Sequence, residues 1–263
     1  MAERADVTDE TVTAPAPQPA IGIDIGGTGI KGAVVDVATG ELLSERIKVP
    51  TPRGGEPADI VAEVARIVDG FGVADVPVGV CFPAVVLGGR TMSAANVSKR
   101  WIGLPAEALF EQTLGRDIVF VNDADAAGVA ELHFGAARNR RGLVIMTTLG
   151  TGIGSALLYD GVLIPNTELG HLEVDGRDAE TRASFAAKER GRLSWRSWAR
   201  RLQRYYETVE KLFSPSLFVV GGGVSKEAAE FLPLLKLRTP IVPAELRNNA
   251  GILGAAWLAA RPR

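Results

Sequence analysis

The chain has 263 residues, 46% of them hydrophobic, and a formal net charge of −2. This length allows a sizeable core, as one large domain or two lobes, and the near-balanced charge gives no general affinity for nucleic acid or membranes. Cys81 is the single cysteine, which excludes a disulfide framework and a cysteine-rich zinc site and fits a reducing cytoplasm. No apolar run approaches the roughly 18–20 residues that span a bilayer, and residues 1–19 are expected to form a disordered tail, not a signal peptide.

Strand-like segments separated by glycine turns open the chain. Residues 20–26, 30–37 and 41–51 are rich in apolar and β-branched residues, which predicts an antiparallel meander. The following pattern predicts a helix over 57–71, a strand over 76–82, a hairpin-like segment through 88–96, a helix over 104–114, a strand over 117–121 and a helix over 125–135.

A second round of the same pattern begins at residue 142. It predicts a strand over 142–148, a glycine loop over 150–154, a strand over 155–164, mostly helix over 179–213, a strand over 216–220, a helix to about 232, a strand over 239–242 and a last apolar helix over 249–260. The order strand, glycine turn, strand thus occurs twice, roughly 125 residues apart, which predicts a duplicated α/β architecture.

The first glycine loop matches G-x-G-x-x-G over residues 27–32. Dinucleotide binding requires this loop to open a helix, but here it opens a strand, so we reject NAD binding. The exposed amides of a tight glycine hairpin suit phosphate oxygens, although an ordinary glycine hairpin would look the same. The candidate phosphate-binding residues are Asp24, Gly26, Gly27, Thr28, Gly29 and Lys31, with Asp24 placed to hold the water ligands of Mg²⁺.

Two further glycine turns repeat this chemistry. Thr148, Gly150, Thr151 and Gly152 form a second loop of glycines and hydroxyls between two strands. Gly221, Gly222 and Gly223 lie between a strand and a predicted helix N-terminus, where the helix dipole would favour phosphates or a nucleotide. Two loops in corresponding positions are far more specific for phosphate than one.

Together, the segments DIGGTGIK, VND, TLGTGIG, VVGGGVS and NNAGILGAA resemble the sugar-kinase branch of the actin/hexokinase/Hsp70 fold. Glu168-Leu169-Gly170-His171 narrows the resemblance to the ROK-type kinases, over about residues 20–260. The resemblance implies a two-lobed actin-like ATPase (ribonuclease H-like) α/β fold with a mixed β-sheet in each lobe and a central cleft. The N-terminal lobe would comprise residues 20–122 plus 248–260, and the C-terminal lobe residues 123–247.

The chain departs from the family after its E-x-G-H segment. ROK-type kinases usually have a zinc-binding cysteine cluster there, whereas residues 172–180 contain no cysteine, so we expect no structural zinc. The short chain and the segment PNTELGHLEVDG resemble actinobacterial glucokinases that use inorganic polyphosphate, and often ATP, to phosphorylate glucose at O6. The glycine turns suit either donor, mannose is not excluded as an acceptor, and relatives are often homodimers.

A sugar pocket needs polar side chains that pair with hydroxyl groups, because an unpaired buried polar group is costly. The candidates are Asn96, Asn122, Asp123, Glu168, His171 and Glu180. Glu180 is included because its spacing resembles that of a sugar-binding glutamate of the family. Asn96 could instead be a turn residue, and His171 a structural histidine.

Asp123, at the end of a predicted strand, is the candidate catalytic base. It would accept the proton of the sugar O6 hydroxyl as that oxygen attacks the terminal phosphorus. The neighbouring Asp125 is expected to cap the helix that it starts, and His133 to pack or lie on the surface.

Eight basic residues and one acid lie between residues 182 and 204. Lys188, Arg192, Arg196, Arg200 and Arg204 recur every four residues, which on one helix would form a basic stripe opposite an apolar face. Such a stripe is usually a solvated helix face, and the alternative is a track for a long polyanion.

Two other classes of function compete with a sugar kinase. A ROK-type repressor would need a DNA-binding helix-turn-helix before the kinase fold, and the first nineteen residues are too short and polar for one. An actin-like ATPase without sugar chemistry would not need the Asn122-Asp123 pair or the Glu168–His171 segment.

Overall fold

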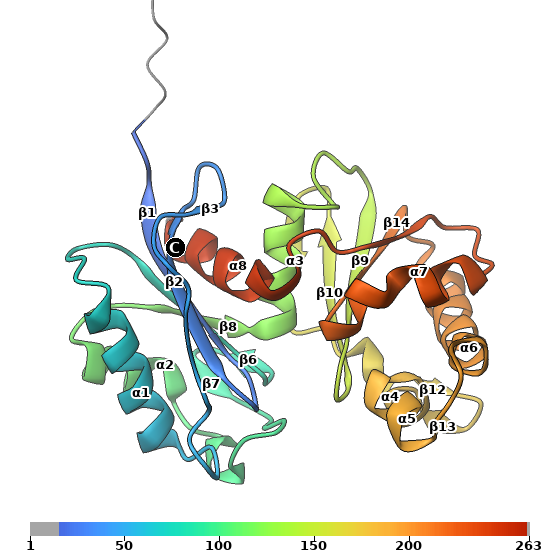
Figure 1. Cartoon of the computed structure of the whole chain (residues 1–263), viewed down its shortest axis with the longest axis horizontal. Coiled ribbons are helices and arrows are strands. Elements are labelled where there is room, and N and C mark those ends of the chain that lie inside the picture. Colours follow the sequence, from blue (N-terminus) through green and yellow to red (C-terminus); the bar gives the residue numbers. More distant parts are fainter. Residues whose placement is uncertain (1–15, 262–263) are drawn as a thin grey trace, which may run out of the picture.

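The computed structural model describes residues 16–261, in which two large β-sheets are separated by a pair of central helices, α3 and α8 (Figure 1), and two further sheets have only two strands each, β6-β7 and β12-β13. Residues 1–15 of the tail predicted for residues 1–19 lie outside the described residues, and its last residue, Pro19, already begins strand β1 (Pro19–Ile25). Within residues 16–261 no helix is long and apolar enough to cross a bilayer.

The first half of the chain builds the sheet on the left of Figure 1 and its covering helices. Its elements are β1 (Pro19–Ile25), β2 (Ile30–Asp36), β3 (Glu41–Leu42), β4 (Ile47–Val49), α1 (Pro57–Gly70), β5 (Val78–Phe82), β6 (Val86–Leu87), β7 (Arg90–Thr91), the 3₁₀ helix η1 (Lys99–Trp101), α2 (Ala106–Leu114) and β8 (Val119–Asn122).

The second half begins with α3 and builds the other sheet. Its elements are α3 (Asp123–Phe134), β9 (Leu143–Leu149), β10 (Ile153–Tyr159), β11 (Val162–Ile164), η2 (Leu169–His171), β12 (Glu173–Val174), β13 (Arg177–Asp178), α4 (Glu180–Ala183), α5 (Phe185–Arg190), α6 (Trp195–Phe213), β14 (Leu217–Gly221), η3 (Gly223–Glu227), α7 (Ala228–Phe231), η4 (Leu232–Leu234), β15 (Ile241–Pro243), η5 (Arg247–Asn249) and α8 (Ala250–Ala259).

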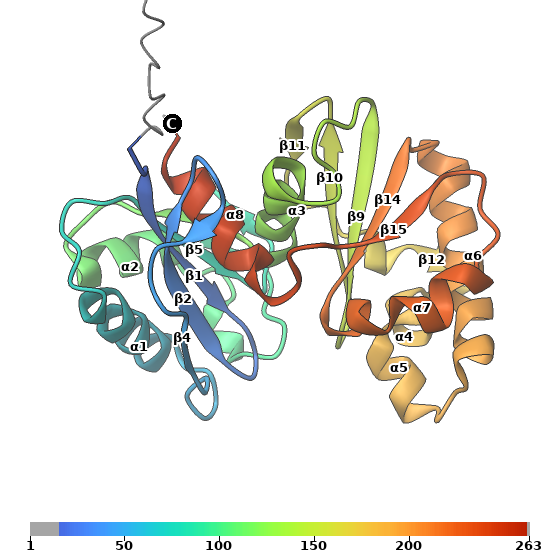
Figure 2. The same cartoon turned by 45° about the horizontal axis from the view of Figure 1, so that its top comes forward.

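The two sheets repeat one topology, as the sequence predicted. The first has the order β3-β2-β1-β5-β8 and the second β11-β10-β9-β14-β15. In each, the first strands form an antiparallel meander and the last two add in parallel, so the sheets are mixed. The fifth strand of each sheet is followed by a central helix, α3 after β8 (Figure 1) and α8 after β15 (Figure 2), which makes the duplication complete.

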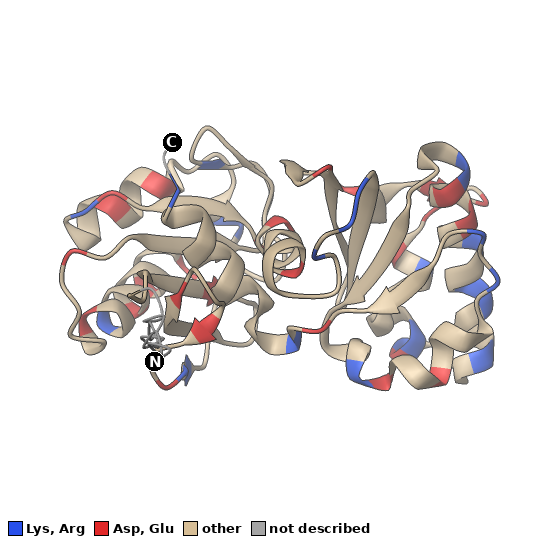
Figure 3. Ribbon diagram, turned by 90° about the horizontal axis from the view of Figure 1, so that it is seen from above, with Lys and Arg blue, Asp and Glu red and all other residues tan. Residues whose placement is uncertain are grey.

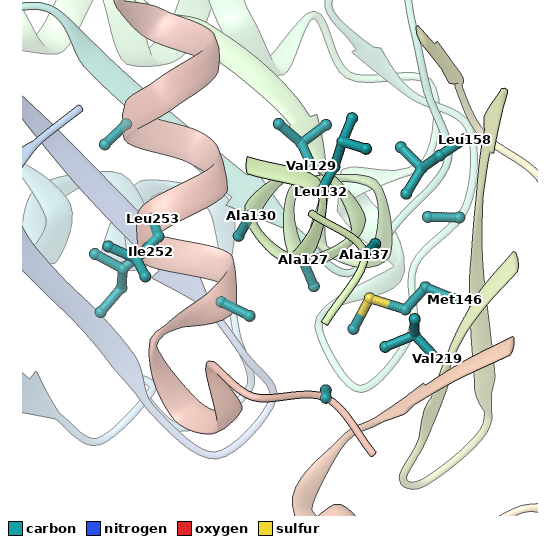
Figure 4. Packing of buried hydrophobic residues seen from close by; sticks show 14 of the residues in the cluster. Ala127, Val129, Ala130, Leu132, Ala137, Met146, Leu158, Val219, Ile252 and Leu253 are labelled. Atoms are coloured by element: carbon teal, nitrogen blue, oxygen red, sulfur yellow. The ribbon is translucent and has the colours of Figure 1, made fainter. Parts of the chain in front are cut away.

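Each central helix follows the fifth strand of one sheet and packs on the other sheet. Helix α8 packs on β1 and β5 of the first sheet, and α3 packs on β10 of the second. Glycine allows the close approach of the two helices: a Cβ on Gly254 would overlap the backbone carbonyl of Ala126. Buried residues from α3, α8 and the second sheet then form one core, as Figure 4 shows for Ala130, Ile252 and Met146. A lobe boundary at residues 122/123 and 247/248 stays a proposal, which these contacts support.

Three details differ from the sequence predictions. The third strand of the meander is interrupted and becomes β3 and β4. The helix expected after the third glycine turn begins as the 3₁₀ helix η3, and α7 has only four residues, so little helix dipole points at Gly223. The basic stripe is not continuous, because the helix breaks between α5 and α6 and Arg192 in the break has φ 45°.

The apolar face predicted beside that stripe does form. Trp198, Leu202 and Tyr205 are buried against the second sheet, with α6 running along its outer side. The basic side chains are exposed or paired instead: Arg204 binds Asp175 at 2.8 Å, and the Lys188 ammonium lies 4.2 Å from the centre of the Trp195 ring.

Candidate active site

A cleft of about 610 Å³ lies between the two halves of the molecule. Its walls carry all six predicted sugar-binding residues: Asn96, Asn122, Asp123, Glu168, His171 and Glu180. They also carry seven of the predicted phosphate-binding residues: Gly26, Gly27, Thr148, Gly150, Thr151, Gly152 and Gly222. The cleft lining does not include Asp24, Thr28, Gly29, Lys31, Gly221 or Gly223. Residues from both sheets therefore meet at one place.

Asp123 is the first residue of α3, where β8 ends at the cleft. Its carboxylate accepts a hydrogen bond from the amide of Ala124 at 2.8 Å. Burial, with the nearby negative charge of Asp24 as the next cause, raises the pKa of Asp123 to about 7. A carboxylate with this pKa can both lose and accept a proton near neutral pH, as a general base must.

The helix cap at this point is Asn122, so the prediction that Asp125 caps α3 is wrong. The Asn122 side-chain oxygen accepts hydrogen bonds from the amides of Ala124 and Asp125, at 2.8 and 3.0 Å. Its amide nitrogen donates to the carbonyl oxygen of Ala84 at 3.0 Å. An asparagine amide has two N–H donors, so Asn122 keeps at most one for a substrate and mainly orients its neighbour, Asp123.

Asp125 is buried within the first turn of α3. One carboxylate oxygen accepts the amide of Asn166 at 2.8 Å, while the other has no hydrogen-bond partner among the described residues. Burial raises the pKa of Asp125 to about 7. Asn166 also exchanges two hydrogen bonds of 2.8 Å with the backbone of Val86 in β6, so it ties the β11–η2 segment to the first sheet.

Glu168 and His171 flank the 3₁₀ turn η2 on the wall of the second half. Gly170 between them packs so closely on β10 that a Cβ would overlap the carbonyl oxygen of Ile153, which explains the glycine of the E-x-G-H segment. Desolvation by the cleft walls raises the pKa of Glu168, although its side chain remains open to the water of the cleft. His171 Nδ1 lies 2.7 Å from Asp178 Oδ2, and this hydrogen bond raises the pKa of His171.

Glu180 connects the sugar wall to the second glycine loop. Its Oε2 accepts the amide of Ile153 at 3.1 Å. A Cβ on Gly152 would overlap the same carboxylate, so a larger residue there would displace the Glu180 side chain from this position. The second glycine loop and the predicted sugar wall are therefore held together by one side chain.

The first glycine loop lies across the cleft and closes with a hydrogen bond of 3.0 Å from the Gly26 amide to the Gly29 carbonyl. Behind it, Lys31 Nζ forms an ion pair of 2.8 Å with Asp24 Oδ2, across the β1–β2 register. Asn96 packs against Gly27 and has φ 61°, so it is both a turn residue and part of the cleft wall.

The third glycine turn approaches the second loop, because a Cβ on Gly222 would overlap the backbone of Leu149. Beyond it a second cavity, of about 450 Å³, is lined by Leu149, Gly150, Phe185, Lys188, Glu189, Trp195, Gly223, Val224, Lys226 and Glu227. Gly150 lines both this cavity and the cleft, so the two are neighbours.

Sequence reasoning missed three residues of the site. Asp178 is hydrogen-bonded to His171, and the Asn166 amide donates to the Asp125 carboxylate. Lys99 contributes a positive charge to the cleft wall. Asp178 had a usable signal, because Asp175-Gly176 is a hairpin dipeptide and both residues have positive φ, as a type I′ turn requires. That hairpin returns the chain towards His171. Lys99 and Asn166 had no local signal.

His171, Asp178 and Glu180 are also the three potential metal ligands that come within 4.8 Å of one another in the described part of the chain. However, the 2.7 Å between His171 Nδ1 and Asp178 Oδ2 is a hydrogen-bond distance, whereas two ligands of one tetrahedral zinc lie about 3.3 Å apart. The geometry is that of an ion pair, and the expectation of no structural zinc stays a prediction.

His133 and Cys81 have structural surroundings. His133 stacks on Trp257 with ring centres 3.7 Å apart, outside the cleft, as its packing role predicted. Cys81, in β5, is fully buried with its thiol 3.6 Å from the Gly251 carbonyl oxygen of α8, and burial raises the pKa of this thiol well above the ordinary value.

Comparisons with known proteins agree with this geometry. The ROK family profile matches residues 20–184. A polyphosphate glucokinase of Mycobacterium tuberculosis is 47% identical over 250 residues, which cover 95% of this chain and 94% of that protein.

Two solved structures extend the comparison. The inorganic polyphosphate/ATP-glucomannokinase of Arthrobacter sp. strain KM is 54% identical, with a TM-score of 0.88 over 92% of this chain and 98% of its own. A glucokinase of Streptomyces griseus, solved in complex with glucose and AMPPNP, is 28% identical, with a TM-score of 0.78 over 92% of this chain and 99% of its own. The predicted two-lobed fold is thereby confirmed.

Proposed function

This chain is a member of the ROK family, as its glycine turns and E-x-G-H segment predicted, and we propose that it transfers the terminal phosphoryl group of inorganic polyphosphate or ATP to O6 of glucose. One observation carries the proposal: a carboxylate with a pKa of about 7, Asp123, lies where phosphate-type glycine loops and sugar-type side chains line the same cleft. The names of the similar proteins support both the acceptor and the donors.

In the proposed reaction Asp123 accepts the proton of the glucose O6 hydroxyl. The O6–P bond forms while the bond between the terminal phosphorus and its bridging oxygen breaks, so the donor leaves as ADP or as a polyphosphate chain shortened by one phosphate. The transition state of such transfers is loose, so positioning and neutralisation of charge provide most of the rate acceleration. The Ala124 amide donates to the Asp123 carboxylate, and Asn122 caps the helix turn that carries this carboxylate.

The sugar is proposed to bind between Asn96 and Asp123 on one wall and Glu168, His171 and Glu180 on the other. These side chains offer carboxylate acceptors and a histidine held by Asp178, which suits hydroxyl groups that both donate and accept. Mannose differs from glucose at one hydroxyl, so we include it among the acceptors.

The donor phosphates are proposed to lie against the amides of the first two glycine loops. Mg²⁺, when bound, would neutralise part of the phosphate charge. Asp24 is its candidate holder: the charge of Asp24 raises the pKa of Asp123, so a cation beside them would relieve repulsion. Because Lys31 already pairs with one Asp24 oxygen, Asp24 would hold Mg²⁺ through a water ligand of the ion and not directly.

For ATP, the cavity beyond Gly150 is proposed to hold the nucleoside. Phe185 and Trp195 offer flat apolar surface there, with ring centres 6.3 Å apart, and Lys188 and Lys226 add positive charge. A polyphosphate chain has no nucleobase, so it needs only the glycine loops and the positive charge of the lysines.

Two further proposals concern the assembled protein. The lone buried Cys81 fits a reducing, cytoplasmic setting. We also propose a homodimer, supported by the edge hairpin β10–β11, on which Tyr159, Val162 and Ile164 expose 56%, 66% and 46% of their surface. Light scattering of wild type and Val162→Lys tests the dimer: a variant that stays dimeric would exclude this surface.

A coupled assay for glucose 6-phosphate tests the function, with ATP, GTP, short polyphosphate and long polyphosphate as donors and glucose and mannose as acceptors. We expect turnover of glucose with polyphosphate and with ATP, and loss of both with Asp123→Asn. Glucose-independent ATP hydrolysis, or binding of glucose without turnover of any donor, would contradict the proposal.

A further inference from the structure

A cavity distinct from the catalytic cleft lies under helix α6 in the second half of the molecule. Its volume is about 350 Å³, and it is lined by Val174, Asp175, Ala179, Arg182, Ala183, Leu193, Ser197, Arg200, Arg201, Arg204 and Tyr205. None of these residues lines the cleft that holds Asp123. We refer to it as the arginine cavity. It lies at the end of the molecule where basic residues gather on helices, on the right of Figure 3.

The charge of this lining is unbalanced. Four arginines, three of them on α6 and Arg182 on α4, face a single carboxylate, that of Asp175. The pKa of Asp175 is lowered, first by its hydrogen bond from Arg204, and Arg182 contributes as well. Glu207, outside the lining, also pairs with Arg204 at 3.6 Å, but Asp175 is the one carboxylate among the lining residues, so the cavity retains an excess of positive charge.

The arginines keep donors that no protein anion uses. A guanidinium has five N–H donors. Arg201 donates one to the carbonyl oxygen of Arg182 at 3.2 Å, and Arg200 donates one to the Ser197 hydroxyl at 3.3 Å, and both of these acceptors are neutral. Guanidinium forks match the geometry of phosphate oxygens, which accept two parallel hydrogen bonds from one arginine.

Tyr205 provides a second, independent observation. The residue is 1% exposed and lines the cavity, yet its hydroxyl has no hydrogen-bond partner among the described residues. A buried polar atom without a partner is unusual and needs an explanation, such as a bound group at that place. The hydroxyl is a neutral donor at physiological pH, since burial raises its pKa well above the ordinary value, and a phosphate oxygen would accept from it.

We propose that the arginine cavity binds a phosphate group, carried either by a small anion such as orthophosphate or a sugar phosphate or by a stretch of polyphosphate chain. The phosphate would take the place of Asp175 at Arg204 and accept hydrogen bonds from Arg182, Arg200 and Tyr205.

The position of the cavity couples it to the sugar wall. Helix α4 has four residues: Glu180 at its start lines the catalytic cleft, and Arg182, one position from its end, lines the arginine cavity. The β12–β13 hairpin carries Asp175 at its turn and Asp178, the partner of His171, at its end. An anion that replaces Asp175 therefore acts on the segment that holds Glu180 and His171, and we expect it to change the KM for glucose.

Calorimetric titration in the absence of glucose tests the binding, because no turnover then occurs. The probes are orthophosphate, glucose 6-phosphate, tripolyphosphate and long polyphosphate. We expect wild type to show a class of sites that Arg182→Ala/Arg200→Ala lacks. Tyr205→Phe should weaken this class by about ten- to a hundredfold, the usual effect of losing one hydrogen bond to a charged group. The matched control is Arg196→Ala, on the same helix but outside the cavity lining.

The probes separate the two sources of phosphate. If orthophosphate or glucose 6-phosphate fills the class lost in the double variant, the ligand is a small anion; if only the polyphosphates do, it is the chain. Identical titrations of wild type, the double variant and Tyr205→Phe with all four probes would overturn the proposal. The result does not depend on the proposed reaction, because Asp123→Asn should retain this binding class even if its turnover is lost.

Discussion

Asp123→Asn changes the proposed base by one atom and should separate catalysis from binding. Asparagine is of the same size, and its oxygen can still accept the 2.8 Å hydrogen bond from the Ala124 amide, so the start of α3 is retained. What is lost is the ability to accept a proton. General-base catalysis typically contributes about 10²–10⁴-fold, so we expect kcat to fall by at least about 10² with KM for glucose within a few-fold of wild type.

The pH dependence provides the second half of this test. The carboxylate is the active form, and its pKa of about 7 means that protonation removes the base as the pH falls. The kcat/KM of wild type should therefore decrease about tenfold for each pH unit well below 7, and the residual activity of Asp123→Asn should lack this limb.

The assay is steady-state formation of glucose 6-phosphate from pH 5.5 to 8.5, with glucose binding measured separately by calorimetry. Asp125→Asn is the matched control, since it makes the same change two residues further along α3, at a residue that does not line the cleft. A variant Asp123→Asn that turns over within a few-fold of wild type, or that keeps the acidic limb, would show that another group takes the proton.

Three further predictions follow from single contacts. Asp125→Asn should raise the free energy of unfolding at pH 8 by about 2–4 kcal/mol, because a carboxyl whose pKa is raised from 3.8 to about 7 destabilises the folded state as the pH rises through this range. Urea unfolding should show a smaller gain in stability at pH 5. An equal gain at pH 5 and pH 8 would show that the raised pKa of Asp125 is not the reason. Gly254→Ala should lower the stability by about 1–3 kcal/mol, because its Cβ would overlap the Ala126 carbonyl at the α3–α8 contact; an unchanged Tm would show that the helices can separate at no cost. Asp178→Ala should raise the KM for glucose about three- to tenfold with little change in kcat, because His171 loses the hydrogen bond that orients it and raises its pKa. Glucose KM values equal to wild type from pH 6 to 8 would remove this role.

Local chemistry explains which parts of the site could be predicted from sequence. Each of the three turns contains a glycine whose Cβ would overlap a neighbour: Asn96 at Gly27, the Glu180 carboxylate at Gly152 and the Leu149 backbone at Gly222. The end of the predicted strand over 117–121, before a predicted helix, indicated where Asp123 would lie.

Two of the wrong predictions concern the residue that caps α3 and the continuity of the helix that carries the basic residues. Asn122 and Asp125 are both good capping residues, and the geometry at the end of β8 selects Asn122 because its side chain also reaches the Ala84 carbonyl. A regular recurrence of basic residues suggested one helix, but Arg192 adopts a left-handed conformation in a break that periodicity does not reveal.

The sequence by itself determined the duplicated strand–turn–strand pattern, the glycine turns and the identity of the acidic residues, because these depend on backbone freedom and periodicity over a few residues. Only the tertiary structure decided how these parts act together. Burial and the charge of Asp24, ninety-nine positions earlier in the chain, raise the pKa of Asp123 to about 7. Likewise, the arginine cavity exists only because α4, the β12–β13 hairpin and α6 fold around one space. Electrostatic and packing effects depend on distance in space, which local sequence patterns do not encode.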